Sequence, residues 1–87
     1  MTANEIEQRV KAVWEEMLQA DNLAPGQSFF EAGGDSLLMI DMLFRLGGEL
    51  GTEIDPGLLF EDATLRGFSA LLAMSRGETE RVEEGII

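Results

Sequence analysis

The 87-residue chain contains no cysteine and no histidine, and each absence excludes a class of chemistry. Without cysteine, neither a disulfide framework nor a thiolate metal site is available, and any thiol chemistry must be imported. Without histidine, the usual base that activates a serine nucleophile is missing. The only lysine, Lys11, lies in a different predicted helix from the serine discussed below. The composition therefore argues against a self-contained hydrolase.

Long apolar runs are also absent. No segment approaches the roughly 18 apolar residues of a membrane span, and the N-terminus has no basic region followed by an apolar one. We therefore expect a soluble, cytoplasmic protein that acts as a monomer. A chain with 87 residues and 45% hydrophobic content has room for one small domain but not for a deep catalytic cleft.

Basic residues are few: six Lys and Arg stand against 17 Asp and Glu, which gives a formal net charge of −11. Residues 21–62 carry nine acids and one base, so most of the negative charge lies in the middle of the chain. Such a surface repels nucleic acid and anionic membranes. The charge favours basic protein partners, although acidic residues can also simply keep a small domain soluble.

Apolar periodicity and capping residues predict an all-α, four-helix bundle with three longer helices and a short third one. A long loop, pinned by Leu23, Phe29 and Phe30, separates the first two helices. We expect residues 1–75 to form the domain and residues 76–87 to be a disordered acidic tail. The predicted elements are helix 4–19, loop 20–35, a helix from Asp35 or Ser36 to near Gly51, a single turn 58–61, and helix 65–74 with Thr64 as its cap.

The second helix has two apolar faces. At 100° per residue, one stripe is coherent and predicts the core: Met39, Met42, Leu43, Leu46 and Leu50. Leu37, Leu38 and Phe44 instead share the opposite arc with Asp41, and Ile40 borders it. Apolar side chains on an outward arc indicate a docking surface. The alternative, that a neighbouring loop or short helix covers them, stays open and is strongest for Ile40.

Ser36 follows two glycines and an acid, and it begins the second helix. Asp35 is a natural N-cap. A hydroxyl at this position lies beside backbone N–H groups that favour negative charge, so it is well placed to carry a phosphate ester.

The chain resembles phosphopantetheine-dependent carrier proteins, most closely the peptidyl carriers of nonribosomal peptide synthesis. The resemblance depends on FFEAGGDSLL at residues 29–38, GTEI at 51–54 and LLFEDATL at 58–65. Ala32 stands where the family often has leucine, and Ala63 where it often has proline. Neither residue takes part in the attachment chemistry.

The resemblance implies that a phosphopantetheinyl transferase attaches 4'-phosphopantetheine from coenzyme A to Ser36, within the motif Gly33-Gly34-Asp35-Ser36. The arm's thiol would then carry an aminoacyl or peptidyl group as a thioester for adenylation, condensation or tailoring enzymes. It further implies a non-catalytic role for the chain and a docking face made of Leu37, Leu38, Ile40, Asp41, Phe44 and Leu59.

Two other functions remain open. An acyl carrier of polyketide or fatty-acid synthesis would keep Ser36 and differ in cargo and partners. An acidic helical interaction module would use residues 33–36 only as a loop and an N-cap. Because the chain starts at Met1 without a long linker, we expect a discrete carrier protein rather than a domain of a multienzyme.

Overall fold

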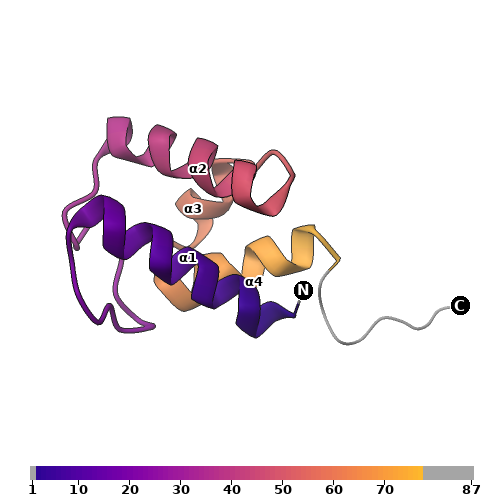
Figure 1. Ribbon diagram of the computed structural model, residues 1–87, viewed down its shortest axis with the longest axis horizontal. Helices are drawn as coiled ribbons and strands as arrows, with labels where there is room; N and C mark the ends of the chain where they lie inside the picture. The colour runs from indigo at the N-terminus through magenta and orange to yellow at the C-terminus, as the bar shows by residue number, and fades with distance from the viewer. Residues whose placement is uncertain (1, 78–87) are drawn as a thin grey trace, which may run out of the picture.

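A computed structural model describes residues 2–77, which contain helices and no β-strand. The bounds are α1 Ala3–Leu18, α2 Ser36–Leu50, α3 Gly57–Glu61 and α4 Leu65–Ser75. The expected all-α fold with a short third helix is confirmed (Figure 1). Within this part of the chain, no helix has the length and apolar character that crossing a membrane requires.

Capping residues fix where the three longer helices begin. Thr2 and Glu5 form a reciprocal capping box, with Glu5 N–H donating to Thr2 Oγ1 at 3.1 Å and Thr2 N–H donating to Glu5 Oε1 at 2.7 Å. At α4, Gly67 N–H donates to Thr64 Oγ1 at 3.0 Å. These bonds satisfy N–H groups that have no partner within the helix, so each predicted start agrees with the structure to within one residue.

The core joins α1 and α4 with the long loop. Trp14 stacks on Phe68 with ring centroids 5.8 Å apart, and it meets the edge of Phe29 at 5.1 Å. All three rings are fully buried. The predicted inner stripe of α2 is confirmed as part of the same core: Met39, Met42, Leu43, Leu46 and Leu50.

The loop between α1 and α2 is held at both ends. Leu23 N–H donates to Glu15 Oε2 at 3.0 Å, and Phe29 N–H donates to the carbonyl oxygen of Ala63 at 2.8 Å. Leu23 and Phe29 are buried as expected. Phe30 was expected to be a core anchor but remains 37% exposed, because its ring meets buried Phe29 edge-on at 5.6 Å and stacks on the exposed ring of Phe60 at 6.4 Å.

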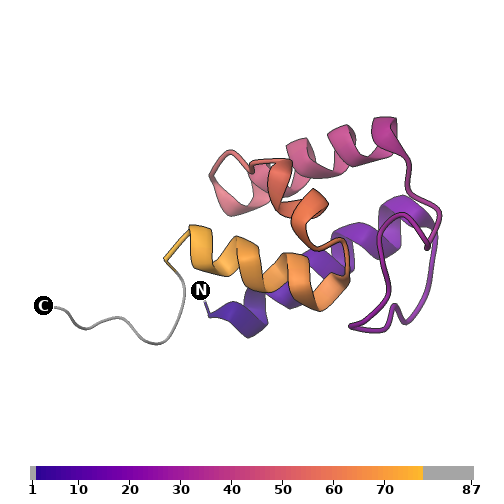
Figure 2. The ribbon, with the colours of Figure 1, turned by 180° about the vertical axis from the view of Figure 1, so that it is seen from behind.

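In space, α1 packs against both α2 and α4, while α3 packs against α4 (Figure 1). Seen from behind, α3 lies between α2 and α4, and the long loop runs along one end of the bundle (Figure 2). This arrangement leaves the N-terminal end of α2 at the edge of the molecule, next to the loop that precedes it.

The structure describes two residues beyond the predicted domain end at residue 75. Arg76, which we assigned to the tail, caps α4, and its guanidinium Nη1 donates to the carbonyl oxygen of Leu50 at 2.8 Å. That bond ties the end of α4 to the end of α2. Residues 78–87 of the expected tail lie outside the described residues.

Candidate functional site

Ser36 is the first residue of α2, and its side chain is exposed. Asp35 precedes it in an extended conformation (φ −132°, ψ −174°) and accepts the Leu38 N–H through Oδ1 at 2.9 Å. Among residues 2–77, no hydrogen bond engages the Ser36 hydroxyl. The cap therefore fixes the backbone beneath Ser36 and leaves the hydroxyl available to a reagent from solvent.

Both glycines before Asp35 have a local structural reason. Gly33 has φ +112°, a conformation that side-chain-bearing residues rarely adopt. A Cβ on Gly34 would lie 2.3 Å from Phe29 Cε2 and 2.8 Å from the carbonyl oxygen of Phe29. Gly34 N–H also donates to that oxygen at 2.9 Å. The backbone thus crosses directly over a buried ring just before it reaches the serine.

Lys11, the only possible lysine base, is engaged elsewhere. Its Nζ donates to Glu15 Oε2 at 2.7 Å on the same helix. That bond, followed by the bond from Leu23 N–H, lowers the pKa of Glu15. Lys11 is therefore bonded to the same carboxylate that holds the long loop.

The outward face of α2 is uncovered. Leu37, Ile40 and Phe44 are 78%, 59% and 85% exposed, and Asp41 is exposed between them. The alternative in which a neighbouring element covers these side chains is therefore wrong, including for Ile40. Leu38 is half-buried and lies at the edge of the face.

Leu59 does not belong to this exposed face. It is fully buried, because the single turn of α3 directs it into the core, and the expectation of a docking residue at this position was wrong. Its neighbour Phe60 is 68% exposed and stacks on Phe30 with ring centroids 6.4 Å apart and an interplanar angle of 12°. Sequence reasoning missed this pair, since its two rings come from different elements.

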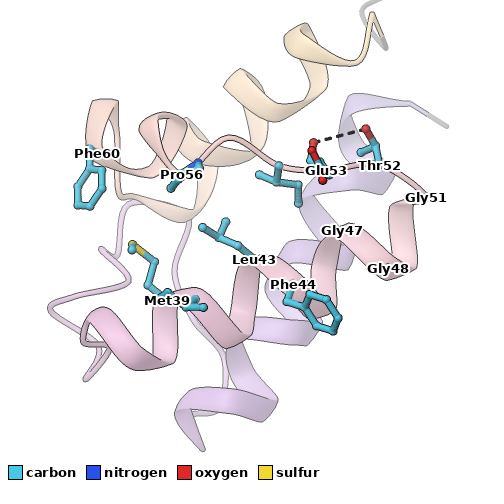
Figure 3. Close-up of a pocket in the computed structure, with 12 residues that line it drawn as sticks. Met39, Leu43, Phe44, Gly47, Gly48, Gly51, Thr52, Glu53, Pro56 and Phe60 are labelled. Carbon is cyan, nitrogen blue, oxygen red and sulfur yellow. Dashed lines mark hydrogen bonds between the residues drawn. The ribbon is translucent and has the colours of Figure 1, made fainter.

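An open groove of about 1040 Å³ separates α2 from the following loop and α3. Figure 3 shows Met39, Leu43 and Phe44 of α2 on one side and Pro56 and Phe60 on the other. At its far end, Thr52 Oγ1 donates to the carbonyl oxygen of Glu53 at 3.4 Å (Figure 3). The sequence analysis did not predict the groove, because its walls are three segments whose spacing only the fold defines.

Asp62 fixes the junction between α3 and α4. Its Oδ1 accepts the Thr64 N–H at 3.0 Å and the Thr64 hydroxyl at 2.8 Å. These two bonds, the backbone one first, lower the pKa of Asp62. Asp62 thereby orients the residue that caps α4 and stabilises the side of the bundle on which α3 packs.

Comparison with protein families gives a match between residues 8–72 and the family described as "Phosphopantetheine attachment site". The polyketide synthase PksN of Bacillus subtilis (strain 168) is 42% identical over 65 residues, covering 75% of this chain and 1% of the relative. Surfactin synthase subunit 1 of the same organism is 34% identical over 76 residues, covering 87% of this chain and 2% of the relative. The chain therefore spans a very small part of these relatives.

A solved structure supports the fold. BlmI, a type-II acyl-carrier-protein from Streptomyces verticillus involved in bleomycin biosynthesis, superposes with a TM-score of 0.78. The match covers 85% of this chain and 89% of that one at 24% sequence identity. The order and arrangement of the four helices described above is thus the fold of that protein.

Proposed function

The chain belongs to the phosphopantetheine attachment family of carrier proteins, and from this premise we propose that Ser36 bears the arm and that the cargo is an aminoacyl or peptidyl group. The observation that carries the proposal is an exposed hydroxyl at the N-terminus of α2, directly next to an uncovered apolar helix face. In this function the chain is a vehicle for cargo and not a catalyst.

The residues around Ser36 fit a covalent 4'-phosphopantetheine. The serine hydroxyl is exposed, and the N-terminus of a 15-residue helix stabilises a phosphodiester by about 0.3–1 kcal/mol when exposed to solvent. Gly33 and Gly34 add no side chain that would obstruct an approaching transferase. When bound, the arm supplies the thiol that this cysteine-free chain lacks, and that thiol holds the cargo as a thioester.

We assign partner docking to the outward face of α2. Leu37, Ile40 and Phe44 provide the apolar contacts, Leu38 borders them, and Asp41 provides a negative charge within the face. Phe60 takes the place that we expected Leu59 to fill. A complementary partner surface has an apolar depression and basic residues around it. A phosphopantetheinyl transferase, an adenylation enzyme, and condensation or tailoring enzymes would each use this surface in turn.

The alternative is an acyl carrier of the polyketide type. It is favoured by the likeness to PksN, whereas the likeness to surfactin synthase subunit 1 favours the peptidyl function. The two functions differ in how the arm is loaded. We expect an adenylation enzyme to load an amino acid onto the phosphopantetheinylated chain, while transfer from a malonyl donor would support the alternative.

The attachment site is tested by intact mass spectrometry after treatment with coenzyme A and a broad-specificity phosphopantetheinyl transferase. We expect the chain without substitutions to gain the mass of one phosphopantetheine and the Ser36→Ala variant to gain none. Ser75→Ala is the matched control, because Ser75 is an exposed serine at the far end of α4, and it should be modified in full. A mass gain in Ser36→Ala would overturn the assignment. The absence of a mass gain in the chain without substitutions would also overturn it.

A further inference from the structure

The turn that precedes α2 is closed by its own hydrogen bonds. We call residues 28–34 the attachment turn. Within it, Ala32 N–H donates to the carbonyl oxygen of Ser28 at 2.9 Å. Gly34 N–H donates to the carbonyl oxygen of Phe29, also at 2.9 Å. Because these two bonds span the turn, a shift at one of its residues also moves its end at Gly34.

The attachment turn lies against the segment that joins α3 to α4. Phe29 N–H donates to the carbonyl oxygen of Ala63 at 2.8 Å. Next to this bond, Ser28 and Thr64 form an isolated antiparallel bridge. The position of the turn is therefore defined by the α3–α4 side of the bundle as well as by α2, which follows it in the chain.

A row of three aromatic rings extends this connection to the surface. Phe29 is fully buried, and Phe30 meets its ring edge-on with centroids 5.6 Å apart. On its other side, Phe30 stacks on the exposed ring of Phe60 from α3. Figure 3 shows Phe60 at the end of the groove near Met39 and away from Gly51. The row therefore joins α3 to the turn on the side where α2 begins.

The short α3 has little local structure of its own to fix it. It contains five residues, its N-cap Pro56 makes no side-chain hydrogen bond, and Leu59 is its one buried residue. A helix with so few buried contacts moves relative to its neighbours more easily than a long one. The stack of Phe60 on Phe30 therefore couples the position of α3 to the attachment turn and, through Gly34, to Ser36.

Arm attachment is a reaction that is sensitive to the position of the serine oxygen. Ser36 Oγ forms a bond to the coenzyme A phosphorus that bears the pantetheine arm, the bond from this phosphorus to the bridging oxygen breaks, and adenosine bisphosphate leaves with that oxygen. The hydroxyl proton goes to a base of the transferase, since this chain has no histidine. The attacking and leaving oxygens lie roughly in line in such a transfer. A misplacement of about 1 Å can lower the rate about 100-fold.

We infer that Phe60 is a positioning residue for arm attachment: through its stack on Phe30 it holds the attachment turn, and thereby the Ser36 hydroxyl, in the orientation that the transferase needs. This role rests on the proposed attachment to Ser36 and is additional to any contact of Phe60 with a partner. The two roles differ in kinetics. Loss of a docking contact raises KM, whereas loss of a positioning contact lowers kcat.

The experiment measures kcat and KM of a broad-specificity phosphopantetheinyl transferase with the full chain as substrate, and follows attachment by intact mass. Phe60→Ala should lower kcat about 3- to 10-fold, and Phe60→Tyr, which keeps the ring, should restore it. Met74→Ala is the matched control and should leave both constants unchanged, because Met74 is an exposed apolar residue of α4 outside the turn and the groove. A higher KM with unchanged kcat in Phe60→Ala would overturn the positioning role.

A double-mutant cycle tests whether Phe30 transmits the effect. Phe30→Ala should lower kcat as Phe60→Ala does, and the double variant should be no slower than the slower single variant, because both substitutions remove the same stack. Two reductions in kcat that multiply in the double variant would show that each ring acts alone, and would overturn the inference.

A second measurement does not depend on the transferase or on the folding of Phe30→Ala. The ¹H–¹⁵N signals of Gly34 and Ser36 should shift in Phe60→Ala and stay in place in Met74→Ala. Unchanged signals in Phe60→Ala would overturn the positioning role. Full attachment with the same kcat in Phe60→Ala and in the chain without substitutions would overturn this role alone, whereas no attachment to the chain without substitutions would overturn the site at Ser36 as well.

Discussion

At the residue scale, Phe29 links the proposed attachment site at Ser36 to the core. Its ring is fully buried against Trp14, and the Gly34 backbone lies directly over it. Gly34 is two residues before Ser36, so any movement of this ring changes the path of the chain into α2. The position of Ser36 is therefore set by packing as well as by the Asp35 cap.

Gly34→Ala should destabilise the fold, because its methyl group would enter the space of the Phe29 ring at 2.3 Å. Overpacking of this kind costs about 1–3 kcal/mol. The free energy of unfolding measured with urea reports the loss, and Gly26→Ala is the control, since a Cβ there meets nothing within 4 Å. The same free energy for both variants would show that Phe29 moves aside without cost.

The sequence predicts Ser36 and its cap correctly as local structure, because an N-cap is encoded within four consecutive residues. The reason for Gly34 could not be predicted in the same way. It depends on the left-handed conformation of Gly33, with φ +112°, which turns the backbone so that Gly34 crosses a ring five residues earlier in the chain. A contact of that kind follows from the folded path and not from a residue pattern.

At the scale of helices, the buried face of the long α2 was predictable from the sequence, and the buried face of the short α3 was not. The inner stripe of α2 runs through four turns, so its periodicity identifies the buried face. In contrast, α3 has five residues, and no periodicity distinguishes Leu59 from Phe60. Their burial is decided by the packing of α3 on α4 and by the stacking of Phe60 on Phe30. The apolar groove beside α3 was missed because its walls come from three segments whose spacing only the fold defines.

The adjacent glycines of α2 should respond in opposite ways to alanine. Gly47→Ala places a Cβ 2.6 Å from a backbone oxygen and should destabilise the fold by about 1–3 kcal/mol. Gly48→Ala meets no atom and should stabilise α2 by about 0.5–1 kcal/mol through helix propensity. Urea unfolding of both variants measures the difference, and each serves as the control for the other. Destabilisation by Gly48→Ala would indicate a packing role that the structure does not contain.

Asp62 should make the stability of the fold depend on pH in the acid range. Because Thr64 lowers its pKa below the reference value of 3.8 in the folded state, its ionised form stabilises the fold above that value, and this contribution is lost as the pH falls through the folded-state pKa. Asp62→Asn keeps the shape without the charge. We expect the melting temperature of Asp62→Asn to lie below that of the chain without substitutions at pH 7. Near pH 2 the two melting temperatures should approach each other. An equal difference at both pH values would contradict this role.

At the scale of the whole molecule, two arginines form exposed ion pairs between helices, and the chain keeps a formal net charge of −11. Arg45 pairs with Glu16 and Arg9 pairs with Glu49, so both ion pairs join α1 to α2. The outward face of α2 is left with Asp41 and exposed apolar side chains. Phe44 and Phe60 belong both to the proposed docking face and to the groove, so a partner bound there would contact both.

Charge and apolar contact should control different steps of partner binding. Because long-range attraction acts on the encounter, raising the salt concentration should lower the association rate of the carrier with its transferase. Asp41→Asn should reduce this salt dependence more than Asp21→Asn, which makes the same charge change in the exposed part of the long loop.

Phe44→Ala should instead raise the dissociation rate and leave the salt dependence unchanged, since its ring contributes only after contact. Stopped-flow measurements at several salt concentrations separate these effects. Identical salt dependence for Asp41→Asn and Asp21→Asn would contradict a docking face on α2.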